Sequence, residues 1–247
     1  MRRLFITILA ALAVTVVSAT AHADDYVLAL SWEPAFCAIK ASDGHVDDRP
    51  ECSQINGTYS TANLILHGLW PQPESNSYCD VPASVSQFDK PGLWDKLPPV
   101  PYTDPSTPKQ LLAYMPGIQS YLDRHEWTKH GTCSKQTPDA YFTKATDLLK
   151  QMNGSRTGTL ISANAGGAIT SSQLCSALVA DFGGKVLNSA TLKVTKVGRE
   201  SVLSELWLYI SDDDQGNLKL GPHNLTGTGG RVRCTDQPIR LLSPSQT

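Results

Sequence analysis

The sequence predicts a single α+β domain with a central, mainly antiparallel sheet packed against helices and held by disulfides. Helical patterns gather in the middle of the chain and strand patterns lie near both ends, which is typical of this class. Six cysteines follow an N-terminal export signal, and an even number in an exported chain indicates disulfides. A chain of 247 residues is long enough for one domain with a substantial core.

The N-terminus is typical of a cleaved secretory signal. Two arginines precede an apolar run (Leu4–Val17), and Ala21-His-Ala23 supplies the small residues of a cleavage site. The alternative is a membrane anchor, but the run is shorter than the roughly 20 apolar residues that a membrane span needs. We therefore expect residues 1–23 to be the signal and residues 24–247 to be the mature domain, in the periplasm or outside the cell.

The charge balance argues against a protein that stores or packages nucleic acid. The chain carries 21 Lys and Arg against 23 Asp and Glu, a formal net charge of −2, and the signal contains basic residues but no acidic ones. Nucleic-acid binders usually present a basic footprint. Binding of a nucleic acid is therefore expected to be local and weak, which an enzyme tolerates because it releases its product.

Strands are expected at both ends of the mature chain. The predicted strands are Tyr26–Trp32, Asn63–Leu66, Thr191–Val197 and Glu205–Ser211. The second of them would be a buried central strand that delivers His67 to its end. Asp213, Asp214 and Gly216 would turn the last strand into a hairpin with Leu218 and Leu220.

Helices are expected between these strands. One begins at Thr107-Pro108 and a second covers Ser120–His130. A third has Thr137 as its cap and Pro138 at its first position, and a fourth covers Ser171–Phe182 and ends at Gly183. The segments Cys37–Tyr59 and Pro71–Pro108 are rich in turn-forming residues or proline and are expected to be mainly irregular.

Two short segments contain side chains that can move protons. They are His67-Gly-Leu-Trp-Pro71 and His125-Glu-Trp-Thr-Lys-His-Gly-Thr-Cys133. On a helix, Glu126, Lys129 and His130 stand at positions i, i+3 and i+4 and share one face. A surface helix with an ordinary Glu–Lys pair gives the same spacing, but the tryptophans and the cysteine favour a partly buried site. The zinc motif H-E-x-x-H is excluded, because Lys129 occupies the second ligand position.

Paired histidines can catalyse displacement at phosphorus without a metal. A neutral and a protonated imidazole supply the base and the acid, with a bell-shaped pH profile and an optimum on the acid side. RNA carries its own nucleophile, the 2′-hydroxyl, so no serine or cysteine nucleophile is required, and no G-x-S-x-G motif is present. Two alternatives stay open: a binding protein of the same fold without catalysis, and a metal-dependent phosphodiesterase.

The two segments resemble the paired active-site motifs of the ribonuclease T2 family and occur in the same order. Leu30-Ser-Trp32 with Phe36-Cys37 is similar to the opening strand of that family, and Ser204–Ile210 resembles a later core strand. The resemblance implies an exported endoribonuclease with residues 24–247 as its catalytic domain. It also implies a monomer that acts on RNA with little base specificity and needs no cofactor, metal, membrane or obligate protein partner.

The resemblance implies a role for each site residue. His130 would be the general base that accepts the 2′-hydroxyl proton, and His67 would be the general acid that protonates the leaving 5′-oxygen. Glu126 and Lys129 would stabilise the phosphorane, and His125 would hold the phosphate. The product would be a 2′,3′-cyclic phosphate, which the same histidines would slowly hydrolyse with their roles reversed.

The resemblance also concerns base contacts and disulfides. Trp70 would contact a base or ribose and Tyr78 would stack on a base, with core packing as the alternative for both. Gln72 stands where some relatives carry an acid, so base preference stays open. The family implies the disulfides Cys79–Cys133 and Cys175–Cys234, which leaves Cys37–Cys52 as the third pair; cysteine spacing alone does not choose among pairings.

Overall fold

Antiparallel pairing dominates the sheet at the centre of the protein. The computed structural model describes residues 25–213 and 217–246, so the expected signal at residues 1–23 lies outside the described residues. The strands are β1 (Asp25–Ser31), β2 (Ile65–Pro71), β3 (Ala168–Thr170), β4 (Ala190–Val197), β5 (Glu200–Ser211) and β6 (Pro238–Arg240). Their order is β2-β1-β5-β6-β3, with β4 also paired to β5, and within this described sheet only the β5–β6 pairing is parallel. The predicted fold class is confirmed.

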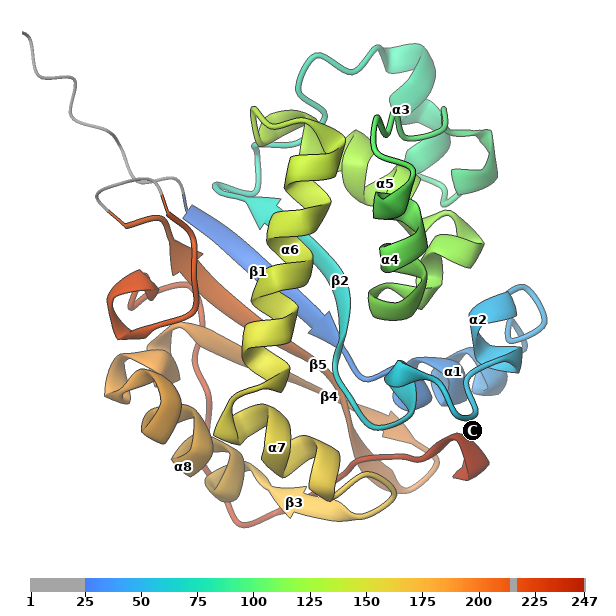
Figure 1. The fold of residues 1–247 in the computed structure, drawn as a ribbon. Coiled ribbons are helices and arrows are strands. Elements are labelled where there is room, and N and C mark those ends of the chain that lie inside the picture. The colour runs from blue at the N-terminus through green and yellow to red at the C-terminus, as the bar shows by residue number, and fades with distance from the viewer. Residues whose placement is uncertain (1–24, 214–216, 247) are drawn as a thin grey trace, which may run out of the picture.

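Most of the described helices lie in two groups around the sheet (Figure 1). They are α1 (Glu33–Ser42), α2 (Pro50–Ser53), α3 (Ala83–Asp89), α4 (Ser106–Tyr114), α5 (Leu122–Lys129), α6 (Pro138–Asn153), α7 (Arg156–Ala163) and α8 (Ser171–Phe182). Helices α6, α7 and α8 lie over one face of the sheet, whereas α3, α4 and α5 gather beside β2. No helix of the described residues is long and apolar enough to cross a membrane.

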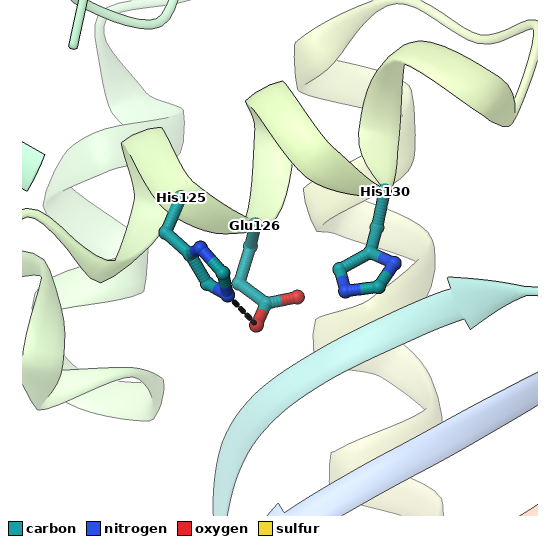
Figure 2. Close-up of side chains that lie close together, drawn as sticks. All are labelled: His125, Glu126 and His130. Atoms are coloured by element: carbon teal, nitrogen blue, oxygen red, sulfur yellow. Dashed lines mark ion pairs between the residues drawn. The ribbon is translucent and has the colours of Figure 1, made fainter. Parts of the chain in front are cut away.

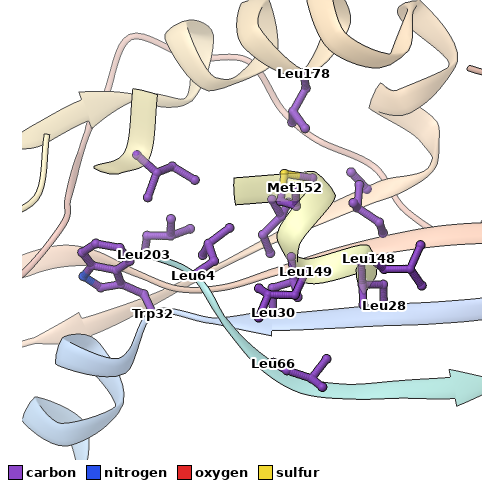
Figure 3. Packing of buried hydrophobic residues seen from close by; sticks show 14 of the residues in the cluster. Leu28, Leu30, Trp32, Leu64, Leu66, Leu148, Leu149, Met152, Leu178 and Leu203 are labelled. Carbon is purple, nitrogen blue, oxygen red and sulfur yellow. The ribbon is translucent and has the colours of Figure 1, made fainter. Parts of the chain in front are cut away.

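The core lies between α6 and the sheet. The α6 side chains Leu148, Leu149 and Met152 are buried and pack over the buried β1 side chains Leu28 and Leu30 (Figure 3). Helix α6 starts as its sequence predicts, since the Thr137 hydroxyl accepts a hydrogen bond from the backbone N–H of Ala140.

The opposite face of the sheet carries polar and aromatic side chains. Along β5, the residues at 206, 208 and 210 are fully buried in the core. Because side chains alternate along a strand, Glu205, Trp207 and Tyr209 point to the other face. A β-bulge at Ser204 precedes them, since Lys193 of β4 pairs with Glu205 while Val194 pairs with Leu203.

A second β-bulge lies at His67. Ala29 of β1 pairs with Gly68 and Leu30 pairs with Leu66, so that His67 is the extra residue of β2. A bulged residue leaves the hydrogen-bonded ladder, which re-aims its side chain. The prediction that His67 ends a central strand is wrong in both respects, because His67 lies within β2 and β2 is at the edge of the sheet. The strand is nevertheless apolar, because it packs against helices α5 and α6.

Several segments have another secondary structure than the sequence predicted. Helices α1 and α2 occupy much of Cys37–Tyr59, because Pro34 in the first turn and the apolar residues after it favour a helix. Helix α3 interrupts Pro71–Pro108, and α7 was not expected at all. Residues 218–220 form no strand; β5 makes its hairpin with β4 instead, and Asp214 and Gly216 lie outside the described residues.

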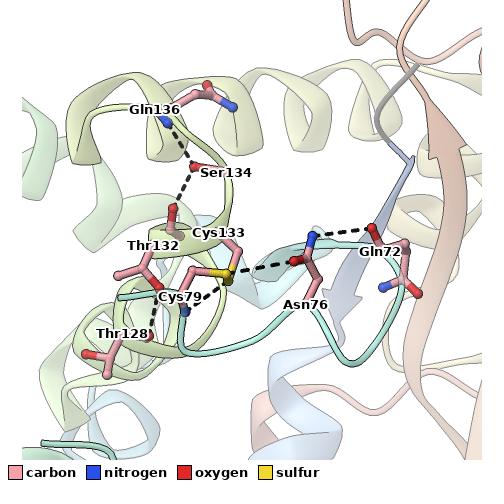
Figure 4. Close-up of a disulfide and its surroundings, with 9 residues drawn as sticks. Gln72, Asn76, Cys79, Thr128, Thr132, Cys133, Ser134 and Gln136 are labelled. Carbon is pink, nitrogen blue, oxygen red and sulfur yellow. Dashed lines mark hydrogen bonds between the residues drawn. A yellow bond between two sulfur atoms is a disulfide. The ribbon is translucent and has the colours of Figure 1, made fainter. Parts of the chain in front are cut away.

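Three disulfides join the described cysteines: Cys37–Cys52, Cys79–Cys133 and Cys175–Cys234. The second, Cys79–Cys133, has a sequence separation of 54 residues (Figure 4). It ties the segment after β2 to the turn that follows α5, and the backbone N–H of Tyr78 donates to the carbonyl of Lys129 beside it at 2.8 Å. A cross-link over a loop of this length contributes roughly 4 kcal/mol to stability in the chain-entropy model.

Candidate active site

His67 and His130 line the same pocket, although they are far apart in the sequence. The pocket encloses a cavity of about 400 Å³, and its walls are formed by Val27, His67, Trp70, Pro71, Gln72, Glu74, His125, Lys129, His130, Trp207 and Tyr209. The sheet supplies one wall, and α5 with the residue that follows it supplies the other. The indole of Trp70 contacts both imidazoles, with centroid distances of 5.3 Å to His67 and 5.3 Å to His130.

Helix α5 delivers the acidic and basic side chains of the second motif. Figure 2 shows that Glu126 projects between His125 and His130, which lie on either side of it. Lys129 ends the helix and His130 is its C-terminal cap residue. The structure thus brings together all four residues for which the sequence suggests a catalytic role, His67, Glu126, Lys129 and His130.

Glu126 is the buried centre of this group, with an exposed fraction of 0%. Its Oε2 accepts a hydrogen bond from the indole N–H of Trp70 at 2.8 Å. Its Oε1 has no hydrogen-bond partner and lies 3.7 Å from Nε2 of His67 and 3.8 Å from Nε2 of His125. Burial raises the pKa of the Glu126 carboxyl, and the two histidines oppose this shift. A Cβ at Gly68 would collide with this carboxylate, so the close approach of β2 requires glycine.

The environment of His67 favours its protonated form. Burial by itself lowers the pKa of the imidazole, but the hydrogen bond with Glu205 and the charges of Glu126 and Glu205 outweigh burial and raise it. The Nδ1 atom of His67 lies 2.8 Å from Oε1 of Glu205, which leaves Nε2 on the side of Glu126.

The environment of His130 favours its neutral form. The residue is 9% exposed and its ring stacks on Trp70 at an interplanar angle of 27°. Burial, followed by the positive charges of Lys129, His125 and His67, lowers the pKa of His130 to about 2. The pKa of His67 is thus raised and the pKa of His130 is lowered within one pocket. An acid–base pair needs this arrangement.

His125 is held at the edge of the pocket by residues from other segments. Its Nδ1 lies 2.7 Å from Oδ1 of Asp89, and its ring stacks on Trp94 with centroids 4.6 Å apart. The hydroxyl of Tyr78 donates to the other oxygen of Asp89 at 2.7 Å. Tyr78 does not line the pocket, and its hydroxyl contacts the same carboxylate that contacts His125.

The sequence did not single out four residues of this site: Asp89, Trp94, Glu205 and Trp207. Glu205 and Trp207 carried a signal, because a carboxylate and an indole at alternate positions of a strand with buried leucines between them indicate a functional face. Asp89 and Trp94 lie in or near short elements between β2 and α5, where no sequence periodicity places one residue relative to another.

The same group has the spacing of a cation site. Within the described residues, His125, Glu126 and His130 each offer one ligand atom, and these atoms lie within 4.8 Å of one another. The Lys129 ammonium lines the same pocket, and its positive charge opposes a divalent cation there.

Comparison with known proteins identifies the family. The model of the ribonuclease T2 family matches residues 23–220. The chain belongs to the ribonuclease T2 family. As a T2-family member it is an enzyme of the ribonuclease type.

Relatives of this T2-family enzyme occur in bacteria and eukaryotes. Ribonuclease I of Escherichia coli is 31% identical over 208 residues, which is 77% of this chain and 76% of the relative. Extracellular ribonuclease LE of Solanum lycopersicum is 28% identical over 142 residues, which is 56% of either chain. The crystal structure of RNase NT in complex with 5′-AMP superimposes with a TM-score of 0.55 over 89% of this chain and 98% of that chain, at 18% identity, so the two share a fold.

Proposed function

We propose that this enzyme is an endoribonuclease that cleaves single-stranded RNA by transphosphorylation, with little base specificity and without a metal. The product would be a 2′,3′-cyclic phosphate, followed by slow hydrolysis to a 3′-phosphate. One observation carries the proposal: His67 and His130 line one pocket, and their surroundings favour opposite protonation states. Family membership supports RNA as the substrate.

In the first step, neutral His130 accepts the proton of the 2′-hydroxyl. The 2′-oxygen attacks the adjacent phosphorus while the bond from phosphorus to the 5′-oxygen breaks. Protonated His67 gives its Nε2 proton to that leaving oxygen. At the end of the step His130 is protonated and His67 is neutral, so that the pair is set for the reverse proton transfers.

Charge on the phosphorane is stabilised by the second motif. The Lys129 ammonium lies in the pocket and offers a positive charge to the phosphoryl oxygens. Glu126 faces His67 and His125, and its charge helps to raise the pKa of His67. His125, oriented by Asp89, would bind a phosphoryl oxygen through Nε2.

In the second step water replaces the 5′-oxygen. His67, now neutral, removes a proton from water, and protonated His130 returns a proton to the 2′-oxygen as the cyclic phosphate opens. Trp70 lines the pocket and is our candidate for contact with a ribose or base, whereas Tyr78 contributes through Asp89.

Product analysis tests the proposed reaction. Short RNAs incubated with the enzyme are expected to yield fragments that end in a 2′,3′-cyclic phosphate at early times and in a 3′-phosphate at late times. Mass spectrometry distinguishes the two ends by the mass of one water. A DNA of the same sequence should stay intact, because it lacks the 2′-hydroxyl. Fragments with a 5′-phosphate and a free 3′-hydroxyl would refute the mechanism.

Removal of metal ions is expected to leave the rate unchanged. The two imidazoles and the Lys129 ammonium supply the proton transfers and the charge stabilisation without a cation. RNA cleavage would be measured before and after dialysis against excess EDTA. A loss of activity that added Mg²⁺ or Zn²⁺ restores would establish a metal-dependent phosphodiesterase instead.

We also propose that the enzyme works outside the cytoplasm as a monomer. Three disulfides and the similarity to an extracellular ribonuclease support an oxidising compartment. The mass of the protein recovered from the periplasm or medium should correspond to a chain that begins at Asp24. Light scattering should give the mass of one such chain.

A further inference from the structure

Glu205 of β5 holds the imidazole of His67 by the nitrogen that faces away from Glu126. Its Oε1 lies 2.8 Å from Nδ1 of His67, while Nε2 of the same ring lies 3.7 Å from Oε1 of Glu126. The two nitrogens of His67 therefore have separate partners on separate elements, one on the sheet and one on α5.

Glu205 is itself fixed in place. Its second oxygen, Oε2, accepts a hydrogen bond from the indole N–H of Trp207 at 2.8 Å, and the hydroxyl of Ser31 donates to Oε1 at 3.4 Å. Burial by itself raises the pKa of Glu205, but the hydrogen bond and the charge of His67, followed by the hydrogen bonds of Trp207 and Ser31, lower it. Both oxygens of the Glu205 carboxylate thus have hydrogen-bond partners, and three neighbouring side chains fix its position.

Other charged groups face His67 and cannot replace this contact. They are Glu33 of α1, Glu126 and Lys129 of α5, and His130; Lys40, Arg49 and Glu51 line the cavity behind the ring together with His67 itself. Burial raises the pKa of Glu33 to about 8, so Glu33 carries little negative charge at neutral pH. Lys129 opposes protonation of His67, and Glu126 lies beyond hydrogen-bond distance from it. Glu205 is the carboxylate that bonds the ring directly.

We propose that Glu205 is a positioning residue for His67, which it holds with Nδ1–H bound and Nε2 directed at the leaving oxygen. This inference rests on the proposed function of His67 as general acid. A neutral imidazole that keeps its proton on Nδ1 is the form left when Nε2 gives up a proton, so the Glu205 contact is satisfied before and after the transfer. Before the transfer, the negative charge of Glu205 also stabilises the protonated ring of His67.

Glutamine at position 205 would disturb both effects. If its amide oxygen stays with Trp207, its NH₂ group faces Nδ1 of His67 and donates to it, which leaves the proton of neutral His67 on Nε2 and makes the ring a poor acid. If the oxygen turns to His67 instead, the hydrogen bond persists without the negative charge. In both cases the pKa of His67 falls, and because the reaction needs protonated His67, activity is lost at a lower pH than in the wild type.

The experiment compares Glu205→Gln, Glu205→Asp and Glu200→Gln in the full mature enzyme. Glu200→Gln is the matched control, because Glu200 starts the same strand, is exposed and pairs with Arg240 away from the pocket. The kcat/KM for a short RNA would be measured across pH, and the His67 ring would be titrated by NMR in protein labelled at the histidine Cε1. We expect Glu205→Gln to lower kcat/KM at neutral pH by about 10- to 100-fold, by analogy with the loss of a carboxylate that orients a metal-binding histidine. We also expect it to move the alkaline limb and the His67 titration to lower pH. Glu205→Asp keeps the charge and should restore part of the rate and of the pKa.

The possible outcomes separate this inference from the proposed function. If Glu205→Gln keeps the wild-type pH profile and the wild-type titration of His67, Glu205 does not position His67, whatever the role of His67. If the titration moves but the rate and its pH profile do not, His67 is not the general acid and the proposed mechanism fails. An equal loss of rate in the Gln and Asp variants, without a shift of the His67 titration, would assign Glu205 a purely structural role and overturn the inference.

Discussion

Replacement of His67 or of His130 by alanine is expected to lower kcat/KM by about 10² to 10⁴, the usual contribution of a general acid or base. His67→Ala removes the proton donor to the leaving oxygen, and His130→Ala removes the acceptor of the 2′-hydroxyl proton. The double variant should be little slower than the slower single one, because the two groups act in the same step. Initial rates on a short RNA would measure each loss.

The control for these variants is His45→Ala. His45 is an exposed histidine. Within the described residues, its one ion-pair partner is Asp48, at 3.5 Å. Its replacement should leave the rate unchanged. Circular dichroism melting would verify that all variants stay folded, as expected for side chains that line a cavity. Near-normal turnover in either His67→Ala or His130→Ala would exclude the two-histidine mechanism.

Replacement of Lys129 by methionine is expected to lower kcat by about 10² to 10³, the effect of removing one group that stabilises developing charge. Methionine keeps an unbranched side chain of similar length but lacks the ammonium. The change should affect kcat more than KM, because the charge on the phosphoryl oxygens grows in the transition state. Steady-state kinetics on a short RNA would separate the two constants.

The pH profile adds a second measurement for Lys129→Met. The charge of Lys129 contributes to the depressed pKa of His130, so its removal should raise that pKa. The reaction needs neutral His130, and the acid limb of the profile should therefore move to higher pH. Lys109→Met, in an exposed position of α4, is the matched control. An unchanged kcat in Lys129→Met would remove Lys129 from the mechanism.

The parts of the site that could be predicted are those set by local geometry. The spacing of Glu126, Lys129 and His130 fixes their common position on or next to one helical turn, and the structure has α5 there. The start of α6 at Thr137 and the end of α8 at Gly183 could also be predicted, because each capping residue acts within one turn of its own helix.

The parts that could not be predicted depend on how distant segments meet. The bulge at His67 follows from the register between β1 and β2, which no periodicity within β2 reveals. The contact of Glu205 with His67 joins residues 138 positions apart. Similarly, β2 was predicted to be central because helices cover an edge strand here, which gives it the composition of an interior one.

The rigid indole of Trp70 contacts the proton donor edge-on and the proton acceptor face-on, so one ring helps to place both imidazoles. The segments beside the pocket, such as residues 72–74, supply lining side chains but neither of the two imidazoles. We therefore expect that these segments can be exchanged, or lengthened, to change which RNA sequences enter without altering the distance over which protons travel. Substrate choice and chemical rate would then be separate variables, available to evolution and to protein engineering one at a time.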